Sequence, residues 1–539
     1  MNKKTTLPKD GIQGLKENIV ADSLSGFLVF LLALPLSLGI AKASDFPPIM
    51  GLMTAMVGGL VVSFFAGSRL TIKGPAAGLI VIVAGSVAEF GQGDSILGWH
   101  LALGALLVAG LLQVLFGMIR MGSLVDFFPL SAVHGMLAAI GVIIMSKQVH
   151  VLLGINPVNE LGKPIVEPME LLAEIPHTLM HIDPKVAVVG LLSLLIVFLW
   201  PRIKQPLLKK IPAPLVVLTM AIPLAKLLGL GKGHLIHFDQ DFIHTLAWNE
   251  RFDGFQQTGI FIKYVIMFAL VGSLESLLTV KAVDMLDPYH RKSNANKDLV
   301  AVGIGNVVAS LLGGLPMISE VARSSANVSN GAKTRWANFF HGVFILIFLM
   351  LDLQFSDLIP FSALAAMLIG VGFKLASPKE FGRMAKIGPE QLVVFCVTIV
   401  VTLMTDLLVG IGVGILVKLV TQFILGVPLK STFKARTQTQ DQTIVVTGAA
   451  VFSNWLGIKK HIDKHATSSN LKLDLTQCNV VDHTVMDNLI HLSNDFDNAG
   501  GKLDLVGLDL LIPTSKSNHA LSTRMREKSN RLDHLGNTK

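Results

Sequence analysis

The segment Leu312–Asn330 interrupts a chain that otherwise consists of long apolar runs. It opens with a Gly-Gly-x-Pro break, and Glu320 and Arg323 follow within two turns. A Gly-Gly pair costs backbone entropy in a helix, and proline lacks the N–H that a helix needs. At membrane depth, a broken backbone survives only where it is buried in protein or lines a wet cavity. This segment therefore restricts the chain to folds that enclose such a break.

We expect Leu312–Pro316 to be a short extended entry and Met317–Ser329 to be a half-helix whose N-terminus points at the membrane centre. Such an end presents free N–H groups and a partial positive charge, which favour an anion. Charged residues inside a membrane are costly, so we expect Glu320 and Arg323 to serve function. The alternative is that they form a mutual ion pair on one helical face and hold the bundle together.

The composition supports a membrane protein. Of 539 residues, 51% are hydrophobic and only 15% are charged, and the mean hydropathy is +0.61. The net charge of +8 does not indicate nucleic-acid binding, because the basic residues lie mostly in short loops and at helix ends, where they favour the cytoplasmic side. Cys396 and Cys478 form no disulfide framework, metal pattern or nucleophile arrangement. No catalytic or cofactor motif is present, so we expect no enzyme and no cofactor.

A second break repeats the order of the first. Arg69–Lys73 is β-prone, Gly74-Pro75 interrupts it, and Ala76–Phe90 is an apolar half-length helix. Proline suits the first helical position, where its missing N–H would be free anyway. Broken segments at corresponding places in two halves of a chain are typical of an inverted-repeat transporter and of its binding site.

The remaining apolar runs are near the span of a bilayer core. With the two half-helices, they give about seven spans in each half, which is the pattern of an inverted repeat. A polar loop is expected at Asn156–Asp183. The full-length runs are Leu24–Ala41, Pro48–Ala66, Leu97–Ile119, Leu130–Leu152, Val186–Trp200, Ile211–Leu230, Phe261–Val283, Asp298–Leu311, Ala337–Leu351, Ile359–Leu375, Gln391–Met404 and Asp406–Gly426.

The composition changes near Lys430. Strand-like and helix-like stretches then alternate, which indicates a small α/β domain. We expect a cytoplasmic leader at 1–20, a transmembrane transport domain at 21–429, the α/β domain at 430–515 and a polar tail at 516–539. The expected strands are Thr443–Thr447, Leu471–Leu475 and Lys502–Gly507, and the expected helices are Trp455–Lys464 and Val485–Asn498.

Several motifs together carry a family resemblance: FLLALPLSLGIA in the first span, the KGPAAG break, GSLESLLTVKAVD, NANKDLVAVGIGNVVASLLGGLPM and NVSNGAKTRWANFFHG. The chain resembles the SulP family of inorganic anion transporters, with a membrane domain followed by a STAS domain. The resemblance implies a polytopic α-helical protein of fourteen transmembrane segments, arranged as a 7+7 inverted repeat. A core domain would move against a gate domain, and the substrate would lie between the half-helix N-termini of segments 3 and 10.

On this resemblance, the substrate-binding residues come from the two breaks. They are Lys73, Gly74, Pro75, Ala76, Ala77, Pro316, Met317, Ile318, Ser319, Glu320 and Arg323. Arg323 matches the family's basic residue and would supply positive field for an anion.

The coupling cation is assigned to the eighth span, where Glu275, Ser276 and Thr279 are polar positions in an apolar run. Glu275 and Thr279 share a helical face and match the family's cation-site positions. The carboxylate can carry a proton, or ligate Na⁺ together with Thr279 if Na⁺ is the coupling ion. Family members with Glu at this position more often resemble H⁺-coupled transporters. The alternative is a protonated glutamate that only bonds neighbouring helices.

Two residues depart from the family pattern. Lys73 and Glu320 stand where small residues are common, at corresponding positions of the two repeats, so we expect them to face each other across the pseudo-twofold axis and to retune the anion site. His134 and His341 are more typical of packed or hydrogen-bonded histidines than of proton relays. In the STAS-like segment, Asp482 is followed by His483 and Thr484 rather than by the regulatory serine. A docking and dimerising role is therefore expected there.

The sequence predicts a secondary active transporter of bicarbonate or sulfate, coupled to H⁺ or Na⁺ by alternating access. The alternatives are a passive anion channel or exchanger, a dicarboxylate transporter of the same family, and a membrane-tethered STAS sensor with little transport. The expected partners are the inorganic anion, the lipid bilayer and a second copy of the chain, with no nucleic acid. We expect a multi-pass protein of the bacterial inner (plasma) membrane with both termini in the cytoplasm.

Overall fold

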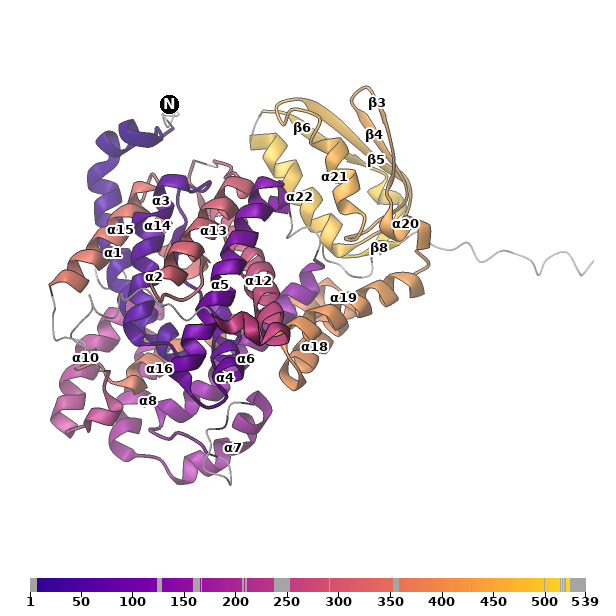
Figure 1. The fold of residues 1–539 in the computed structure, drawn as a ribbon. Helices are drawn as coiled ribbons and strands as arrows, with labels where there is room; N and C mark the ends of the chain where they lie inside the picture. Colours follow the sequence, from indigo (N-terminus) through magenta and orange to yellow (C-terminus); the bar gives the residue numbers. More distant parts are fainter. Residues whose placement is uncertain are drawn as a thin grey trace, which may run out of the picture. The chain divides into compact units, whose positions relative to one another are not determined.

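The computed structural model describes residues 7–123, 128–158, 165, 167–205, 208, 211–236, 253–289, 291–351, 358–427, 429–498, 500–513, 515, 517 and 520–523. The chain divides into two compact units. The first consists of residues 1–125, 137–377 and 402–408, and the second of residues 126–136, 378–401 and 409–539. Figure 1 shows helices throughout the first unit and the mixed sheet of the second.

Long apolar helices dominate the N-terminal four-fifths of the chain. Eight helices in the described ranges are long and apolar enough to cross a membrane. The helices are α1 (Gly11–Ala43), α2 (Pro48–Leu60), α3 (Val62–Phe65), α4 (Ile80–Gly91), α5 (Ser95–Met118), α6 (Leu130–Leu152), α7 (Pro168–Met180), α8 (Pro184–Leu199), α10 (Ala213–Leu228), α12 (Thr258–Leu286), α13 (Ala295–Leu311), α14 (Val321–Ser329), α15 (Trp336–Met350), α16 (Phe361–Leu375), α17 (Pro378–Ile387), α18 (Pro389–Met404) and α19 (Leu407–Ile424).

Most expected spans coincide with these helices, and α6 matches its expected range at both ends. The expectation of a polar loop at Asn156–Asp183 was wrong in part, because that range contains α7. This short helix is amphipathic rather than apolar, with Leu171 and Thr178 buried, and a hydropathy criterion for spans does not detect it. The helix α1 begins within the expected leader, so the first span continues a helix that starts at Gly11.

The two breaks form one small sheet. Strand β1 (Ile72–Pro75) pairs antiparallel with β2 (Met317–Glu320), and Lys73 lies opposite Ser319 in the register. A 3-10 turn at Ala77–Leu79 and then α4 follow β1, and α14 follows β2 directly. Two extended segments that are more than 200 residues apart in sequence therefore pair with each other. We call this pair, Ile72–Pro75 with Met317–Glu320, the crossing.

The expected half-helix Met317–Ser329 was wrong at its start, because β2 occupies its first four residues and the helix begins at Val321. Gly74 and Pro75 likewise lie inside β1 and do not precede a helix directly. The reason is pairing: each strand satisfies backbone groups of the other, which a broken segment at membrane depth needs.

Side chains from neighbouring helices hydrogen-bond to backbone N–H and C=O groups in and beside the two strands. The Asn306 amide of α13 donates to the Met317 carbonyl (3.2 Å) and its oxygen accepts the Met317 N–H (2.7 Å). The Thr54 hydroxyl of α2 accepts the Leu315 N–H at 2.7 Å, and Asn338 of α15 accepts the Lys73 N–H at 3.2 Å. Each of these bonds reaches the break from a different helix, so the crossing is fixed from several sides.

The second unit contains a mixed sheet in the order β3-β4-β5-β8-β7, with β6 pairing to β5. The apolar faces of α21 and α22 share a buried core with the sheet, centred on Trp455, Leu473 and Leu489. The strands are β3 (Arg436–Gln440), β4 (Thr443–Ala450), β5 (Asn470–Val481), β6 (Lys502–Val506), β7 (Ile512–Pro513) and β8 (Ser522–Thr523), and the helices are α20 (Leu429–Phe433), α21 (Trp455–Ile462) and α22 (His483–Asn498).

The predicted strands and helices of this segment are all present, and β3, β7 and β8 were missed. Strand β8 lies in the expected polar tail at 516–539, so the sheet extends past residue 515. Residues 524–539 of that tail lie outside the described residues. Thr484 is buried at the start of α22, where its hydroxyl accepts the Leu130 N–H at 3.3 Å.

Candidate functional site

Arg323 is the most unusual side chain at the crossing. It is fully buried in the first turn of α14, and its Nε, Nη1 and Nη2 atoms have no hydrogen-bond partner among the described residues. Its Nη1 lies against the α-carbon of Gly74 in β1, at the place where any other residue would carry a Cβ. A buried guanidinium with five donors and no acceptor is costly, so this side chain offers a binding group for an anionic or polar ligand.

Glu275 on α12 contacts the first break in the same way that Arg323 does, but at Gly78 instead of Gly74. Its Oε1 lies against the α-carbon of Gly78, which follows β1, and its buried Oε2 has no hydrogen-bond partner in the described part of the chain. The KGPAAG segment therefore contacts an unpartnered guanidinium at Gly74 and an unpartnered carboxyl at Gly78. Only glycine permits both approaches, because a Cβ at either position would overlap the charged group.

The other two predicted cation-site residues lie on the same helix. Thr279 is buried one turn after Glu275, which puts both on one face of α12. Ser276 has a different contact: its hydroxyl accepts the Ser319 N–H at 3.1 Å and so fastens α12 to β2. These side chains offer oxygen ligands. No cluster of three or more His, Cys, Asp or Glu side chains that could hold a metal occurs among the described residues.

Glu320 does not face Lys73 as expected. Its Oε2 accepts the backbone N–H of Arg323 at 2.8 Å, which makes Glu320 the N-cap of α14. The carboxylate thus occupies the end of the half-helix, where a negative charge is favoured by the helix dipole. No hydrogen bond joins the Glu320 carboxylate to the Arg323 guanidinium among the described residues, so the two charges act on each other without direct contact.

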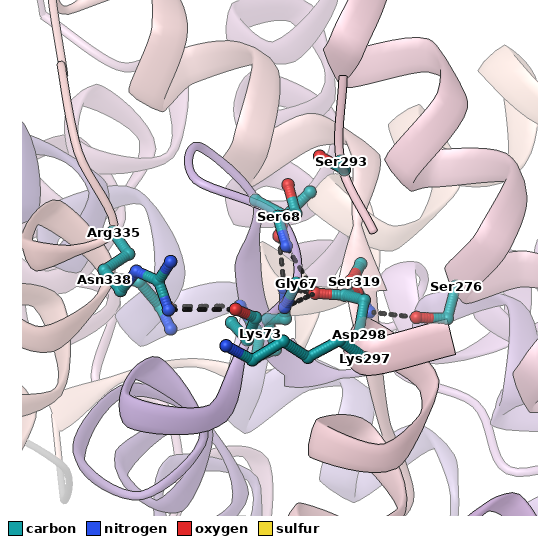
Figure 2. A network of polar contacts seen from close by, with 12 residues as sticks. Gly67, Ser68, Lys73, Ser276, Ser293, Lys297, Asp298, Ser319, Arg335 and Asn338 are labelled. Carbon is teal, nitrogen blue, oxygen red and sulfur yellow. Dashed lines mark hydrogen bonds and ion pairs between the residues drawn. The ribbon is translucent and has the colours of Figure 1, made fainter. Parts of the chain in front are cut away.

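Lys73 has two side-chain partners instead, one of them a carboxylate (Figure 2). Its ammonium donates to Asp298 Oδ1 of α13 at 2.9 Å and also contacts the Thr71 hydroxyl, and both charged side chains are buried. Asp298 further accepts the Ser68 N–H (3.0 Å) and the Ser319 hydroxyl (3.1 Å). This ion pair joins β1, β2 and α13 at one point.

Sequence reasoning missed Asp298 as a site residue, although it lies in the NANKDLVAVG motif. A signal was available: Asp298 is a lone acidic residue at the start of an apolar run, and Lys73 is a lone basic residue beside a break. Nothing in the sequence says that the two are neighbours, because 225 positions separate them.

The other predicted substrate residues come together at the crossing. Gly74 lies opposite Ile318 and Pro75 opposite Met317, and the Ala76 N–H donates to the Pro316 carbonyl at 3.4 Å. The structure thus brings both halves of the predicted set to one place. All are buried except Glu320, which is partly exposed.

One further buried group lies outside the predicted set. His341 on α15 is fully buried, and neither Nδ1 nor Nε2 has a hydrogen-bond partner among the described residues. The expectation that it is packed is met, but the hydrogen bonds expected of a buried histidine are missing.

Residues 19–398, which include both breaks and every predicted site residue, match the model of the sulfate permease family. The chain belongs to the sulfate permease family. Its relatives include the putative sulfate transporter YvdB of Bacillus subtilis, which is 27% identical over 72% of this chain and 70% of its own length. The bicarbonate transporter BicA of Picosynechococcus is 24% identical over 72% of this chain and 68% of its own length.

Solved structures agree on the fold. The transmembrane domain of a cyanobacterial bicarbonate transporter BicA matches with a TM-score of 0.64 and 24% identity, over 73% of this chain and 97% of that one. The structure of SLC26A9 matches with a TM-score of 0.65 and 15% identity, over 92% of this chain and 85% of that one. The protein is therefore a multi-pass helical membrane protein of an anion-transporter family, and its relatives are transporters rather than enzymes.

Proposed function

We propose that the protein is a secondary active transporter of a small inorganic oxyanion, bicarbonate or sulfate, coupled to H⁺ or Na⁺ by alternating access. The anion binds at the β1–β2 crossing, between the starts of α4 and α14, and Glu275 carries the coupling cation. No cofactor takes part. The family membership and relatives described as sulfate and bicarbonate transporters support the class of substrate.

The observation that carries this proposal is the unpartnered guanidinium of Arg323. A buried charge in a low-dielectric interior costs several kcal/mol, so a guanidinium that donates no hydrogen bond to any described residue favours a ligand of opposite sign. A planar guanidinium binds the oxygens of an oxyanion in a bidentate fashion, which suits carbonate-like and sulfate-like groups. The strand-to-helix turn at α14 adds the field of a helix N-terminus, which Glu320 partly occupies.

Glu275 serves as the coupling residue because its buried carboxyl contacts Gly78, in the same KGPAAG segment that Arg323 contacts at Gly74. When Glu275 holds a proton or Na⁺, the negative charge beside the site is removed, and an anion binds more easily. When it releases the cation, the anion is repelled. This reciprocal effect is the simplest physical basis for coupled transport.

The proposed arrangement of the transmembrane segments is based on the two breaks. Antiparallel β1 and β2, each followed by a short helix, support a 7+7 inverted repeat of fourteen segments with a mobile core and a gate. The α/β segment is assigned as a STAS domain that docks and dimerises. We place the protein in the bacterial inner membrane, with both termini in the cytoplasm.

The test is uptake into proteoliposomes with separate pH and Na⁺ gradients. Wild-type protein should accumulate sulfate or bicarbonate against its own gradient. Glu275→Gln keeps the volume and hydrogen bonding of the side chain but cannot exchange a proton or ligate Na⁺ with a formal charge. We expect this variant to lose gradient-driven accumulation and to keep exchange of anion down a gradient.

Two outcomes contradict the proposal. Accumulation by Glu275→Gln with unchanged pH and Na⁺ dependence would show that coupling lies elsewhere. Equilibration without accumulation by the wild-type protein would indicate a passive channel or exchanger. Including a small dicarboxylate in the substrate panel distinguishes the third alternative, and Ser273→Ala, a buried hydroxyl on the same helix, is the matched control.

A further inference from the structure

Lys147 on α6 contacts the turn between α1 and α2 through its ammonium. The Nζ donates to the Ala43 carbonyl at 3.1 Å and to Asp45 Oδ2 at 3.0 Å. Ala43 is the last residue of α1, where carbonyls lack partners within the helix and the helix dipole favours a cation. Asp45 has a φ of +59°, a left-handed conformation in which glycine is the default, and its carboxylate gives Lys147 a second acceptor. Lys147 therefore joins α6 to the end of α1.

Lys263, near the start of α12, lies between two carboxylates. Its Nζ is 2.8 Å from Glu89 Oε1 of α4 and 4.0 Å from Asp406 Oδ2. The neighbouring Tyr264 hydroxyl donates to the same Glu89 oxygen at 2.8 Å. Asp406 lies in the turn between α18 and α19, immediately before α19 begins. Lys263 therefore joins α4 and α12 to the α18–α19 turn.

Both lysines lie at the same end of the first unit. The ring centroids of Phe46, next to Asp45, and of Trp99 near the start of α5 are 6.1 Å apart. Gln257, just before α12, donates to the Phe90 carbonyl near the end of α4 at 3.2 Å. Because α5 follows α4 after a short connection, the ends of α1 and α4 and the starts of α5 and α12 lie together. We call this the α4 end.

Each ion pair joins a helix that supports the crossing to a part of the chain that continues into the second unit. Helix α2 packs against the β1 backbone at Gly58, and α12 hydrogen-bonds to β2 through Ser276. The turn at 402–408 belongs to the first unit, whereas α18 and α19 on either side of it belong mainly to the second. Helix α6 likewise begins in the second unit, at residues 130–136. A movement of α6 and of the α18–α19 turn away from the crossing must therefore break both pairs.

We propose that Lys147 and Lys263 form a gate that closes the anion pathway at the α4 end. Their ion pairs with Asp45 and Asp406 hold α6 and the α18–α19 turn against the helices that support the crossing. Both pairs break when the anion site opens to this end. Partly exposed ion pairs add little to stability, which suits a contact that forms and breaks in each transport cycle. This inference rests on the proposed function, because it assumes alternating access.

The experiment bridges the two sides of the gate covalently. Full-length protein with Cys396→Ser and Cys478→Ala is the background, and the test pair is Asp45→Cys with Lys147→Cys. A short bifunctional methanethiosulfonate bridges the two thiols, and a reductant removes it. Uptake of radiolabelled sulfate and bicarbonate into proteoliposomes is measured before bridging, after bridging and after reduction.

We expect bridging to slow uptake at least about tenfold, because an end that cannot open stops the cycle, and reduction to restore it. Anion binding should persist in the bridged protein, since the site still opens at the other end. The shift in thermal unfolding midpoint with sodium sulfate or sodium bicarbonate measures that binding. Lys263→Cys with Asp406→Cys in the same background should give the same result.

The matched control is Lys9→Cys with Glu17→Cys, because this ion pair of 2.9 Å lies within one N-terminal segment. Bridging it should leave uptake unchanged. Uptake at the unbridged rate by either bridged gate pair would overturn the inference, because the contact would then stay closed throughout the cycle. The proposed function fails separately: wild-type protein that takes up neither anion would refute coupled transport itself.

Charge reversal is a second test that needs no reagent. Lys147→Asp puts two carboxylates side by side, so the closed state becomes less populated and uptake should fall about threefold to fivefold. Adding Asp45→Lys restores opposite charges and should recover most of the rate. A double variant that has the wild-type unfolding midpoint but recovers no uptake would also overturn the inference.

Discussion

Lys73 and Arg323 are two buried cations at one crossing, and they differ in a single respect. Lys73 in β1 pairs with Asp298 at 2.9 Å inside a network that also binds Ser319 (Figure 2). Arg323, just after β2, has no hydrogen-bond partner for any guanidinium nitrogen in the described part of the chain. A cation that is hydrogen-bonded to a carboxylate holds the frame together, whereas one whose donors have no protein acceptor is available to a ligand.

The difference arises from where the neighbouring carboxylates go. Asp298 lies in the first turn of α13 and reaches Lys73 directly. Glu320 is only three residues from Arg323, but it accepts a backbone N–H of α14 and leaves the guanidinium free. Glu320 therefore does not hydrogen-bond the Arg323 guanidinium although it is close in sequence, whereas Asp298 pairs directly with Lys73 although it is 225 positions away.

The largest expected effect comes from Asp298→Ala. It leaves the Lys73 ammonium buried without a counter-charge and frees the Ser319 hydroxyl and the Ser68 N–H. Removing one partner of a buried pair costs about 3–5 kcal/mol, so we expect a large drop in thermal unfolding midpoint or loss of folded protein in detergent.

The double variant Lys73→Met with Asp298→Leu removes both charges and replaces them with apolar groups. It should recover the part of the loss that comes from the unpaired ammonium, because a buried ion pair exchanged as a whole is often nearly neutral, but not the bonds from Ser68 and Ser319 to Asp298. If Asp298→Ala unfolds no more easily than wild type, the ion pair is not structural and Lys73 becomes a candidate ligand for the anion.

Arg323→Gln should show the opposite pattern. No ion pair is broken, so the unfolding midpoint without anion should stay the same or rise. Anion binding should weaken by about 2–4 kcal/mol, because a charged donor to a desolvated ligand is lost. Isothermal titration with sulfate or bicarbonate measures the loss. Arg335→Gln, at a partly buried arginine that donates to the Ala66 carbonyl and pairs with Asp10 at 3.7 Å, is the control for anion binding alone. A fall in stability with unchanged binding would reverse the assignment of the two cations.

The sequence predicted the existence and place of both breaks and nearly every long helix, because glycine, proline and apolar length act locally. It misplaced the start of the helix after the second break, since strand pairing between Ile72–Pro75 and Met317–Glu320 is a long-range property. The residues of the two predicted breaks lie side by side in the β1–β2 pair, although Lys73 and Glu320 do not face each other as expected. Which cation is paired could not be predicted, because it depends on whether a carboxylate 225 positions away reaches the ammonium.

Substitutions at Gly74 and Gly78 test the proposed anion-binding group and the proposed cation-binding group separately. Gly78→Ala forces a Cβ into the Glu275 carboxyl, and Gly74→Ala forces one into the Arg323 guanidinium. The contacted atoms are the ends of flexible side chains, so each charged group must move aside while the backbone stays in place. We expect Gly74→Ala to weaken anion binding and Gly78→Ala to change cation dependence first, as measured by uptake at varied pH and Na⁺. Gly412→Ala, which meets no atom within 4 Å in the described chain, is the control. Identical effects of both substitutions would mean that anion and cation share one subsite.

The smallest expected effect is that of Glu320→Gln, and it tests the comparison most directly. The amide oxygen still accepts the Arg323 N–H, so the N-cap survives and stability should change by about 1 kcal/mol or less. Removal of a partly exposed negative charge near the site should strengthen anion binding by a few fold, since such charge interactions are worth about 0.2–1 kcal/mol. Thermal unfolding with and without sulfate measures both quantities. If Glu320 were the counter-ion of Arg323, the same substitution would destabilise the protein by about 3–5 kcal/mol. A loss of that size would make Arg323 a paired cation like Lys73, and the anion would then need a different binding group.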